Sequence, residues 1–410
     1  MTSTALYTDH YELTMLDAAL RAGMADRPVV FEVFTRSLPP GRRYGVFAGL
    51  GRLLDALERF VFGPEELDWL SARGFLSDRA VEWLGAYRFG GEIHAYPEGE
   101  LYTGGSPVLA VCGGFGEAVL LETMVLSILN YDSAVASAAS LITAAAAGRP
   151  VIEMGSRRID PEAAVAAARA AYVGGLASTS NLEAGRRYGI PTAGTSAHSF
   201  MLLFPDERQA FEAQLASLGR DTTLLVDTFD TAEGIRAAVE AAGPGLGAVR
   251  IDSGDLGAEA VRARALLDSL GARGTRVVAT GDLDEKAIHR LSSTPVDAYG
   301  AGTSVVTGSG YPTSGFIYKL VEVEGQPVAK RSPGKATVGE RKWAWRVPDE
   351  GLDVVSPEPG RAPERSRVLH SVVVEGGKRT EPGDVDAARA RHRRSCEELG
   401  PERALVLERR

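Results

Sequence analysis

The residues Val249-Arg250-Ile251-Asp252-Ser253-Gly254-Asp255 set the pattern that decides the fold: a short apolar run that ends in polar residues and a glycine. A helical stretch follows, and another apolar run comes directly after it. The same alternation extends from about residue 150 to 306, with apolar runs at 151–154, 175–179, 190–195, 224–227, 249–252, 277–281 and 298–303. Strands that alternate with helices at this density are parallel and are joined by right-handed crossovers. The pattern predicts either a β/α barrel or an open doubly wound sheet.

Polar residues follow nearly every apolar run, and this favours the barrel. The carboxyl ends of barrel strands converge on one mouth, whereas an open sheet offers ligands only the crevice at its switch point. Glycine, serine, threonine and aspartate after strands also form turns and helix caps, and Asp227, Thr228 and Ser253 fit that simpler interpretation. Capping does not require two arginines and a histidine, so we expect a site at the mouth.

The two ends of the chain follow a different pattern. Residues 1–116 mix helical and strand segments, 117–147 form a long helical stretch, and antiparallel strands are expected after 306, at 316–323, 328–330, 342–347 and 368–374. A surface loop is expected at 349–365 and a charged helix from 384. We therefore expect an irregular TIM-like β/α barrel with an appended α+β domain built from both chain ends. The predicted division is 1–116, 117–310 as the catalytic barrel, and 311–410.

Composition excludes several classes of protein. The 410 residues carry a net charge of -9, and no dense run of basic residues precedes the C-terminal tail, which argues against a nucleic-acid surface. The alanine-rich segment 134–147 is interrupted by hydroxyl residues and predicts a buried helix, not a membrane span. Cys112 and Cys396 are too far apart in sequence to suggest a disulfide framework or a zinc site. A cytoplasmic protein is expected.

His198 is the centre of the candidate site. A loop histidine is usually just hydrogen-bonded, but this one ends a predicted barrel strand among small residues that leave it accessible. Arginines, carboxylates and a glycine-rich run at strand ends suit a substrate with phosphates and hydroxyls: Arg157, Arg250, Asp252, Asp282 and 300–304. P-loop, dinucleotide, zinc-protease and hydrolase-elbow motifs are missing from the sequence.

Several blocks, in order, resemble nicotinate phosphoribosyltransferases over nearly the whole chain. They are Tyr7-Thr8-Asp9-His10-Tyr11-Glu12-Leu13-Thr14-Met15, Glu153-Met154-Gly155-Ser156-Arg157-Arg158, Gly194-Thr195-Ser196-Ala197-His198-Ser199-Phe200, Ile251-Asp252-Ser253-Gly254-Asp255-Leu256 and Gly302-Thr303-Ser304-Val305-Val306-Thr307. The resemblance implies the type II phosphoribosyltransferase fold. It also implies transfer of ribose 5-phosphate from phosphoribosyl pyrophosphate to nicotinate in NAD biosynthesis, with release of pyrophosphate and coupling to ATP hydrolysis. Magnesium and a homodimer with shared active sites are further implications.

The resemblance also implies roles for individual residues. His198 matches the histidine that the family phosphorylates, and Arg250 and Asp252 join it as catalytic residues. Tyr11 matches a tyrosine that packs on nicotinate across a dimer interface, although a core position on an amphipathic helix is the competing interpretation. Positions matching substrate contacts are Arg157, Asn181, Thr195, Arg250, Gly281, Asp282, Gly302 and Thr303, with Asp252 and Asp282 on the magnesium side.

Asn181 favours nicotinate over nicotinamide. Related nicotinamide enzymes carry an aspartate there, which would accept from an amide and repel a carboxylate. A quinolinate enzyme would need more basic residues, because its substrate carries two carboxylates, and it would not need the histidine block. A non-catalytic phosphoribosyl sensor is a further possibility, and so is a barrel aldolase or lyase, although the chain lacks the strand-end lysine that the latter would use. Some relatives carry a zinc-binding cysteine knuckle that this chain cannot form, so packing alone is expected to close the appended domain.

Overall fold

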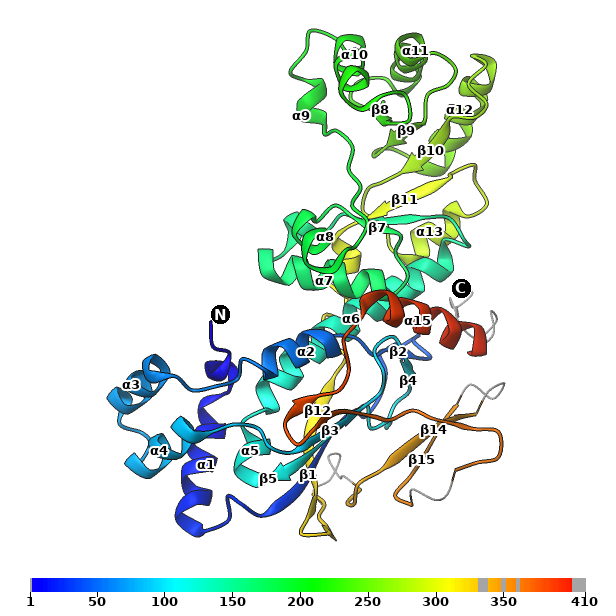
Figure 1. The fold of residues 1–410 in the computed structure, drawn as a ribbon. Helices are drawn as coiled ribbons and strands as arrows, with labels where there is room; N and C mark the ends of the chain where they lie inside the picture. Colours follow the sequence, from blue (N-terminus) through cyan, green and yellow to red (C-terminus); the bar gives the residue numbers. More distant parts are fainter. Residues whose placement is uncertain (1, 331–337, 348–351, 359–361, 400–410) are drawn as a thin grey trace. The chain divides into compact units, whose positions relative to one another are not determined.

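A computed structural model of the 410-residue chain describes residues 2–330, 338–347, 352–358 and 362–399. The chain forms two compact units (Figure 1). The first unit contains the residues up to Ser137 and those from Tyr311 onward, and the second unit contains Ala138–Gly310. The later division coincides with the boundary expected at 310. The earlier one lies within a long helix that we expected to belong to the barrel.

A six-stranded parallel sheet forms the centre of the second unit. Its order is β7-β6-β11-β10-β9-β8, so every pair of neighbours in the sheet except β6 and β11 is also consecutive along the chain. The strands are short: β6 Val151–Glu153, β7 Ser178–Thr179, β8 Thr223–Leu225, β9 Ala248–Ile251, β10 Arg276–Ala279 and β11 Ala298–Ala301. Parallel pairing throughout the sheet confirms the expected α/β class.

Helices connect these strands, and acidic or amide side chains start most of them. The helices are α7 Pro161–Val173, α8 Leu182–Tyr188, α9 His198–Met201, α10 Glu207–Leu218, α11 Thr231–Ala242, α12 Leu256–Ser269, α13 Glu285–Leu291 and α14 Thr303–Val306. Side-chain oxygens accept from free backbone N–H groups at the N-terminal ends of α7, α8, α10, α11, α12 and α13. The capping residues are Asp160, Asn181, Asp206, Asp230, Asp255 and Asp284.

The run at 190–195 is not the strand that we expected. Only Thr192 bridges to the sheet, in parallel with Thr179 of β7. Pro191 has no amide hydrogen to donate, so pairing there is confined to its carbonyl and to the N–H of Ala193. The six strands therefore form the curled half of a TIM-like barrel, with β7 and β8 as its ends.

The first unit is built from both ends of the chain, as expected. Its seven-stranded sheet has the order β13-β12-β1-β5-β3-β17-β18, and β12, from the C-terminal part, pairs antiparallel with β1. The strands are β1 Pro28–Thr35, β3 Glu92–Ala95, β5 Leu109–Gly114, β12 Phe316–Val323, β13 Gln326–Pro327, β17 Ser371–Glu375 and β18 Lys378–Arg379. Two smaller sheets join β2 Gly45–Val46 with β4 Leu101–Tyr102, and β14 Trp343–Val347 with β15 Leu352–Ser356 and β16 Arg367–Val368. β15 corrects the surface loop expected at 349–365.

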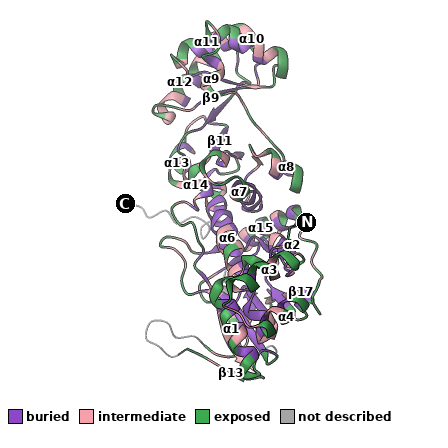
Figure 2. Ribbon diagram, turned by 90° about the vertical axis from the view of Figure 1, so that its left-hand side faces the viewer, coloured by how far each residue is buried: buried purple, intermediate pink, exposed green. Residues whose placement is uncertain are grey.

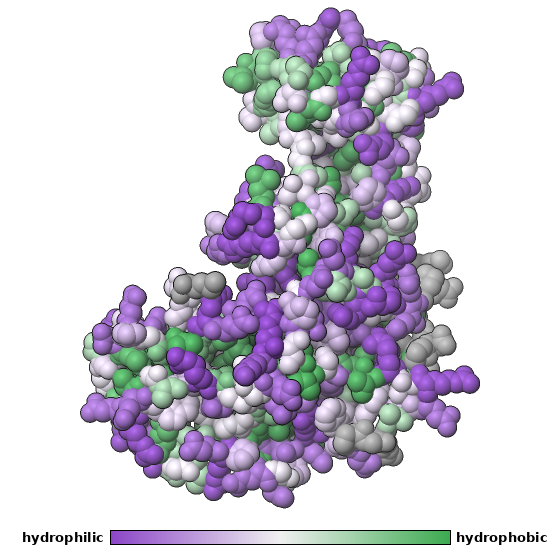
Figure 3. Space-filling view, in the orientation of Figure 1, coloured by the Kyte–Doolittle hydropathy of each residue, from purple (hydrophilic) through white to green (hydrophobic). Residues whose placement is uncertain are grey.

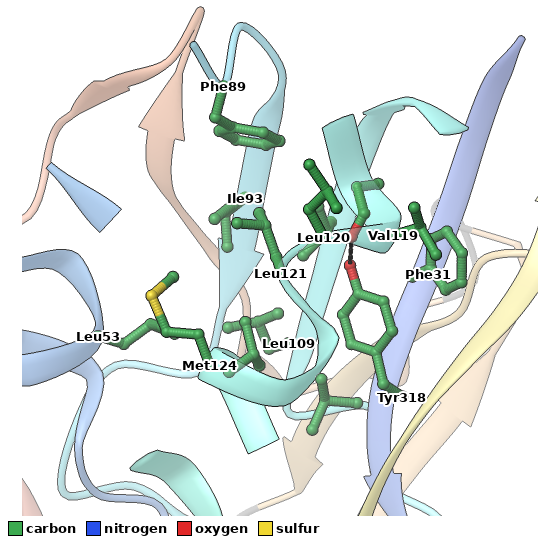
Figure 4. Packing of buried hydrophobic residues seen from close by; sticks show 14 of the residues in the cluster. Phe31, Leu53, Phe89, Ile93, Leu109, Val119, Leu120, Leu121, Met124 and Tyr318 are labelled. Carbon is green, nitrogen blue, oxygen red and sulfur yellow. Dashed lines mark hydrogen bonds between the residues drawn. The ribbon is translucent and has the colours of Figure 1, made fainter. Parts of the chain in front are cut away.

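Apolar side chains of this sheet and its helices form one large core. The helices are α1 His10–Ala22, α2 Leu50–Leu57, α3 Pro64–Arg73, α4 Asp78–Ala86, α5 Phe115–Val119, α6 Glu122–Ala145 and α15 Val385–Leu399. Figure 4 shows Leu120, Leu121 and Met124 packed among strand residues, with the Tyr318 hydroxyl donating to the carbonyl of Ala118 at 2.8 Å. Only the stretch 115–145 is long and apolar enough to cross a membrane within the described residues, and 67% of its most apolar window is buried. Figure 2 shows α6 buried along much of its length, as a core helix is.

Buried ion pairs also stabilise the first unit, which corrects the expectation of packing alone. Arg346 is almost completely buried and contacts Asp353 at 2.8 Å and Glu100 at 3.3 Å. Arg367 contacts the same Glu100 at 2.7 Å, and Ser395 of α15 donates to it. Burial alone would raise the pKa of Glu100, but the hydrogen bond from Arg367 and the charges of both arginines hold it below its ordinary value. These contacts tie the β14–β16 sheet and α15 to the segment before β4.

Two buried histidines should make the first unit sensitive to acid. Burial lowers the pKa of His370 and His392 from 6.5 to about 4. The folded pKa lies below the unfolded one, so the unfolded chain binds more protons between these values and stability falls as the pH drops from about 6.5 to 4. The loss is on the order of 3 kcal/mol per histidine. Denaturant unfolding at several pH values measures it.

A matched pair of variants checks that prediction. His370→Gln keeps a donor for the Pro107 carbonyl, which the imidazole contacts at 2.5 Å, but does not titrate. It should make the stability profile between pH 6.5 and 4 less steep, because only His392 then contributes, whereas His289→Gln, at an exposed helix position, should leave it unchanged. An unchanged profile in His370→Gln would show that His370 is not the group responsible.

Candidate functional site

Hydrogen bonds join His198 to the ends of two strands of the second unit. The imidazole Nε2 lies 3.2 Å from Oδ1 of Asp227, which follows β8. The other carboxylate oxygen of Asp227 accepts from the backbone N–H of Asp252 at 2.8 Å and from the Ser253 hydroxyl at 2.7 Å. The Asp227 side chain is 1% exposed and that of His198 is 41% exposed. A buried, fully used carboxylate thus holds an accessible imidazole.

Arg250 is the second centre of the site. It is the third residue of β9, and its guanidinium donates to Thr280 Oγ1 at 2.8 Å, Thr195 Oγ1 at 2.7 Å, the carbonyl of Ser196 at 3.2 Å and Asp252 Oδ1 at 2.9 Å. Thr280 also donates to the same oxygen of Asp252. Arginine has five N–H groups, and the second N–H on Nη2 makes none of these hydrogen bonds.

The charge of Asp252 is stabilised by these neighbours. Burial alone would raise the pKa of Asp252, but the hydrogen bonds from Thr280 and Arg250 and the charge of Arg250 lower it below its ordinary value. Asp252 is therefore a carboxylate at neutral pH. Four of the residues predicted from the sequence lie in one network: Thr195, His198, Arg250 and Asp252.

Asn181 belongs to a neighbouring group at the ends of β6 and β7. Its side-chain N–H donates to Ser156 at 3.0 Å, and its carbonyl oxygen caps α8. Ser156 begins the 3-10 turn η2 Ser156–Arg158, which places Arg157 at the surface. Arg157 has no hydrogen bond or ion pair to another described residue, so its guanidinium is available.

Glycines bring the remaining loops together at the same edge. A Cβ on Gly302 would lie 3.1 Å from the Met154 carbonyl oxygen, so a larger residue would push the loops after β11 and β6 apart by a few tenths of an ångström. Gly281 has φ +133° and lies against the Asp252 carbonyl. Asp282 and Thr303 follow these glycines and are exposed. Within the described part of the chain, no group of three or more His, Cys, Asp or Glu side chains could hold a metal ion by itself.

Tyr11 belongs to the first unit, where it lies on α1. It is 43% exposed, so the interpretation as a core position is wrong. Burial of its hydroxyl and the carboxylates of Glu122 and Glu12 raise the pKa of Tyr11 to about 12, which keeps the phenol neutral. Its approach to the strand-end residues stays a prediction.

Comparison with known proteins gives the site its context. The model of the nicotinate phosphoribosyltransferase N-terminal domain matches residues 6–130. A nicotinate phosphoribosyltransferase of Mycobacterium tuberculosis (strain ATCC 25618 / H37Rv) is 54% identical over 94% of this chain and 88% of its own length. The chain belongs to the nicotinate phosphoribosyltransferase family.

Other members agree in sequence and in fold. The Bacillus subtilis (strain 168) nicotinate phosphoribosyltransferase is 35% identical over 84% of this chain and 73% of its own length. The crystal structure of human nicotinic acid phosphoribosyltransferase matches with a TM-score of 0.83 at 26% identity, covering 97% of this chain and 95% of that one. A nicotinate-nucleotide pyrophosphorylase from Pyrococcus furiosus has a TM-score of 0.81 at 26% identity, with 98% and 96% covered. These matches confirm the resemblance inferred from the blocks.

Sequence reasoning missed three contributors to the site. Asp227 and Ser253 are not merely caps or turn formers: the caps of α11 and α12 are Asp230 and Asp255, while Asp227 contacts His198. Thr280 lies at the end of an apolar run, and apart from its hydroxyl nothing in the neighbouring sequence indicates a role in the site. Its role depends on Arg250 and Asp252, which lie 30 and 28 residues away.

Proposed function

We propose that this chain is an ATP-coupled nicotinate phosphoribosyltransferase that makes nicotinate mononucleotide for NAD synthesis. The observation that carries the proposal is the accessible His198, held by buried Asp227 beside the Arg250 and Asp252 network. Family membership supports the transfer reaction, and the network supports the coupling.

The His198–Asp227 contact assigns the two ring nitrogens. The Asp227 carboxylate can only accept a hydrogen bond, so Nε2 carries the hydrogen and donates it to Asp227, which leaves the lone pair on Nδ1. In our proposal Nδ1 attacks the γ-phosphorus of ATP, the bond to the bridging oxygen breaks, and ADP leaves with that electron pair. The proton stays on Nε2, hydrogen-bonded to Asp227, and the negative charge of Asp227 offsets the positive charge that develops on the ring. The phosphorylated ring then adds charge beside the bound substrates and changes their affinity.

Arg250 and Thr195 would hold nicotinate by its carboxylate. The Arg250 N–H outside the network and the adjacent Thr195 hydroxyl supply donors at one point. Arg157, Gly302 and Thr303 would hold phosphate oxygens, using an uncommitted guanidinium and a loop that a Cβ would obstruct. The ring nitrogen of nicotinate then replaces pyrophosphate on the ribose, and pyrophosphate leaves with the bonding electrons.

Magnesium fits this site only as an ion shared with the substrates. Mg²⁺ is commonly bound by one or two carboxylates together with substrate phosphates. Asp252, charged at neutral pH, and exposed Asp282 are the residues that would hold it. When bound, the ion would neutralise phosphate charge during transfer.

A homodimer would complete the site by supplying Tyr11. Tyr11 and Met15 lie one turn apart on α1, and they are exposed, as is Tyr7 just before the helix. Exposed apolar side chains of this kind suit a surface that packs against a partner. Figure 3 also shows hydrophobic side chains over α9 and α10 of the second unit, where Leu202 and Leu203 are exposed. These surfaces support the proposal of two copies. We also propose that the enzyme is cytoplasmic.

Asp227→Asn should uncouple the reaction in part. The amide can still contact His198, but it cannot offset the imidazolium charge. A hydrogen bond that involves a charged group contributes about 1.5–3 kcal/mol, and most of this is lost when the charge is removed, so ATP hydrolysis should slow by up to roughly 100-fold. Steady-state ATPase assays in the presence of both substrates measure it. Asp230→Asn, at the nearby cap of α11, is the control, and equal rates in the two variants would remove Asp227 from the mechanism.

One assay tests the proposed function directly. The protein is incubated with phosphoribosyl pyrophosphate and Mg²⁺, with nicotinate, nicotinamide or quinolinate in turn, with and without ATP. Mass spectrometry should find nicotinate mononucleotide as the preferred product, formed more extensively with ATP. Preference for either other pyridine, or no product from any, would refute the proposal.

A further inference from the structure

A closed ring of hydrogen bonds links the loops after β6 and β7. Gly155 N–H donates to Oε1 of Glu153, and the Thr179 hydroxyl donates to Oε2 at 2.5 Å. The same Thr179 oxygen accepts from the backbone N–H of Asn181 at 3.0 Å. The Asn181 side chain donates to the Ser156 hydroxyl, and the peptide bond between Ser156 and Gly155 closes the ring.

Two residues of the ring, Glu153 and Thr179, are shielded from water. Glu153 is 0% exposed and Thr179 is 1% exposed. Both oxygens of Glu153 accept a hydrogen bond, so the carboxylate has a defined position and solvent does not compete for its donors. Glu153 also accepts through its backbone carbonyl from Ser180 N–H at 2.8 Å, so one residue fixes the ends of both strands.

The ring fixes which way the Asn181 amide faces. Its Oδ1 accepts from the Ala184 N–H at 2.8 Å, as the cap of α8, while its Nδ2 donates to Ser156. A flipped amide would place an NH₂ against the Ala184 N–H and lose the cap. The second hydrogen on Nδ2 therefore remains as a donor, and the oxygen is directed at the N-terminal end of α8.

We propose that Glu153, Thr179 and Ser156 are positioning residues for pyridine selectivity, because they hold Asn181 as a hydrogen-bond donor toward the substrate. A donor at this position suits the carboxylate of nicotinate, whereas the NH₂ of nicotinamide would also need an acceptor, and the Asn181 oxygen is directed at the N-terminal end of α8 instead. The inference rests on the proposed function, in which Asn181 faces the pyridine substituent.

Thr179 offers a matched test. Thr179→Val keeps the shape but removes the hydroxyl that joins Glu153 to Asn181, and Thr179→Ser retains it. Thr179→Val should raise the KM for nicotinate roughly tenfold and lower the nicotinate to nicotinamide ratio of kcat/KM by a similar factor, while Thr179→Ser stays close to wild type. A merely structural role would reduce the active fraction, and thus kcat, without changing KM or the ratio.

The control is Thr275→Val. Thr275 is equally buried, and its hydroxyl donates to the Leu246 carbonyl at 2.9 Å just before β10, at the opposite end of the strands. It should leave both KM and the selectivity ratio unchanged, with thermal unfolding measured for every variant. Equal kinetic effects of Thr275→Val and Thr179→Val would overturn the proposal.

Ser156→Ala provides a second test of the ring, and it leaves the buried Glu153 and Thr179 unchanged. It removes the acceptor of Asn181 Nδ2 and should change the selectivity ratio in the same direction as Thr179→Val. Asn181→Ala is the reference: if it changes selectivity while neither Thr179→Val nor Ser156→Ala does, the ring has no positioning role. If Asn181→Ala has no effect, the position assigned to Asn181 is wrong. Absence of any nicotinate product in the wild-type protein would instead refute the proposed function.

Discussion

His198→Ala should abolish ATP hydrolysis that depends on nicotinate and phosphoribosyl pyrophosphate, while weak, uncoupled transfer persists. The variant removes the nitrogen that would accept the phosphoryl group, and no other histidine contacts Asp227 among the described residues. The strand-end donors Arg250 and Thr195 remain, so nicotinate can still bind. We expect ATP turnover to fall by about 1,000-fold or more, as for loss of a covalent nucleophile.

Ser199→Ala is the control for that variant. Ser199 is adjacent and exposed, and its substitution should leave coupling intact. ADP release and nicotinate mononucleotide formation, followed in the same sample, give the ratio of ATP hydrolysed to product made. Normal coupled turnover in His198→Ala would show that the phosphate carrier is another residue.

Arg250→Ala should raise the KM for nicotinate roughly 100-fold, because an unpaired carboxylate loses a charge-assisted hydrogen bond worth about 2–3 kcal/mol. The guanidinium side chain is 13% exposed and also holds Thr195, Thr280 and Asp252, so kcat should fall as well. Arg250→Lys keeps the charge but cannot bridge these partners, and we expect an intermediate KM. Initial rates over a range of nicotinate concentrations measure the change.

Arg262→Ala is the matched control for the loss of an arginine. Arg262 is exposed on α12 and contacts only Glu259 in the described structure, so its substitution should leave the KM unchanged. Circular dichroism and thermal unfolding show whether each variant is folded. A folded Arg250→Ala protein with an unchanged nicotinate KM would place the carboxylate contact elsewhere.

The β/α unit could be predicted because its signal is local. Each apolar run ends in residues that stop a strand and begin a helix, and the caps Asp230, Asp255 and Asp284 do so in the structure. The run at 190–195 has the same apolar character but becomes a bridged loop, because Pro191 lacks a donor and the edge of β7 offers few partners. Composition alone does not distinguish such an edge segment from a strand.

Contacts between distant residues could not be predicted in this way. Asp227 resembles other turn aspartates in sequence, and only the fold shows that it contacts His198, 29 residues earlier. Glu153 lies in a recognised block, yet its role depends on Thr179, 26 residues away. The buried pair of Arg346 and Glu100 joins positions 246 residues apart. Periodicity identifies the elements that carry these residues, but tertiary pairing decides their partners.

The most direct test of the proposed coupling is transfer of radiolabelled phosphate from the γ position of ATP to the protein. Acid-labile, base-stable label on His198, located by proteolysis and mass spectrometry, is the predicted result. Addition of nicotinate and phosphoribosyl pyrophosphate should remove the label from the protein at the same time as unlabelled nicotinate mononucleotide forms. The His198→Ala protein should not be labelled. Label on another residue, or full ATP-coupled turnover without labelled His198, would show that His198 does not carry the phosphate.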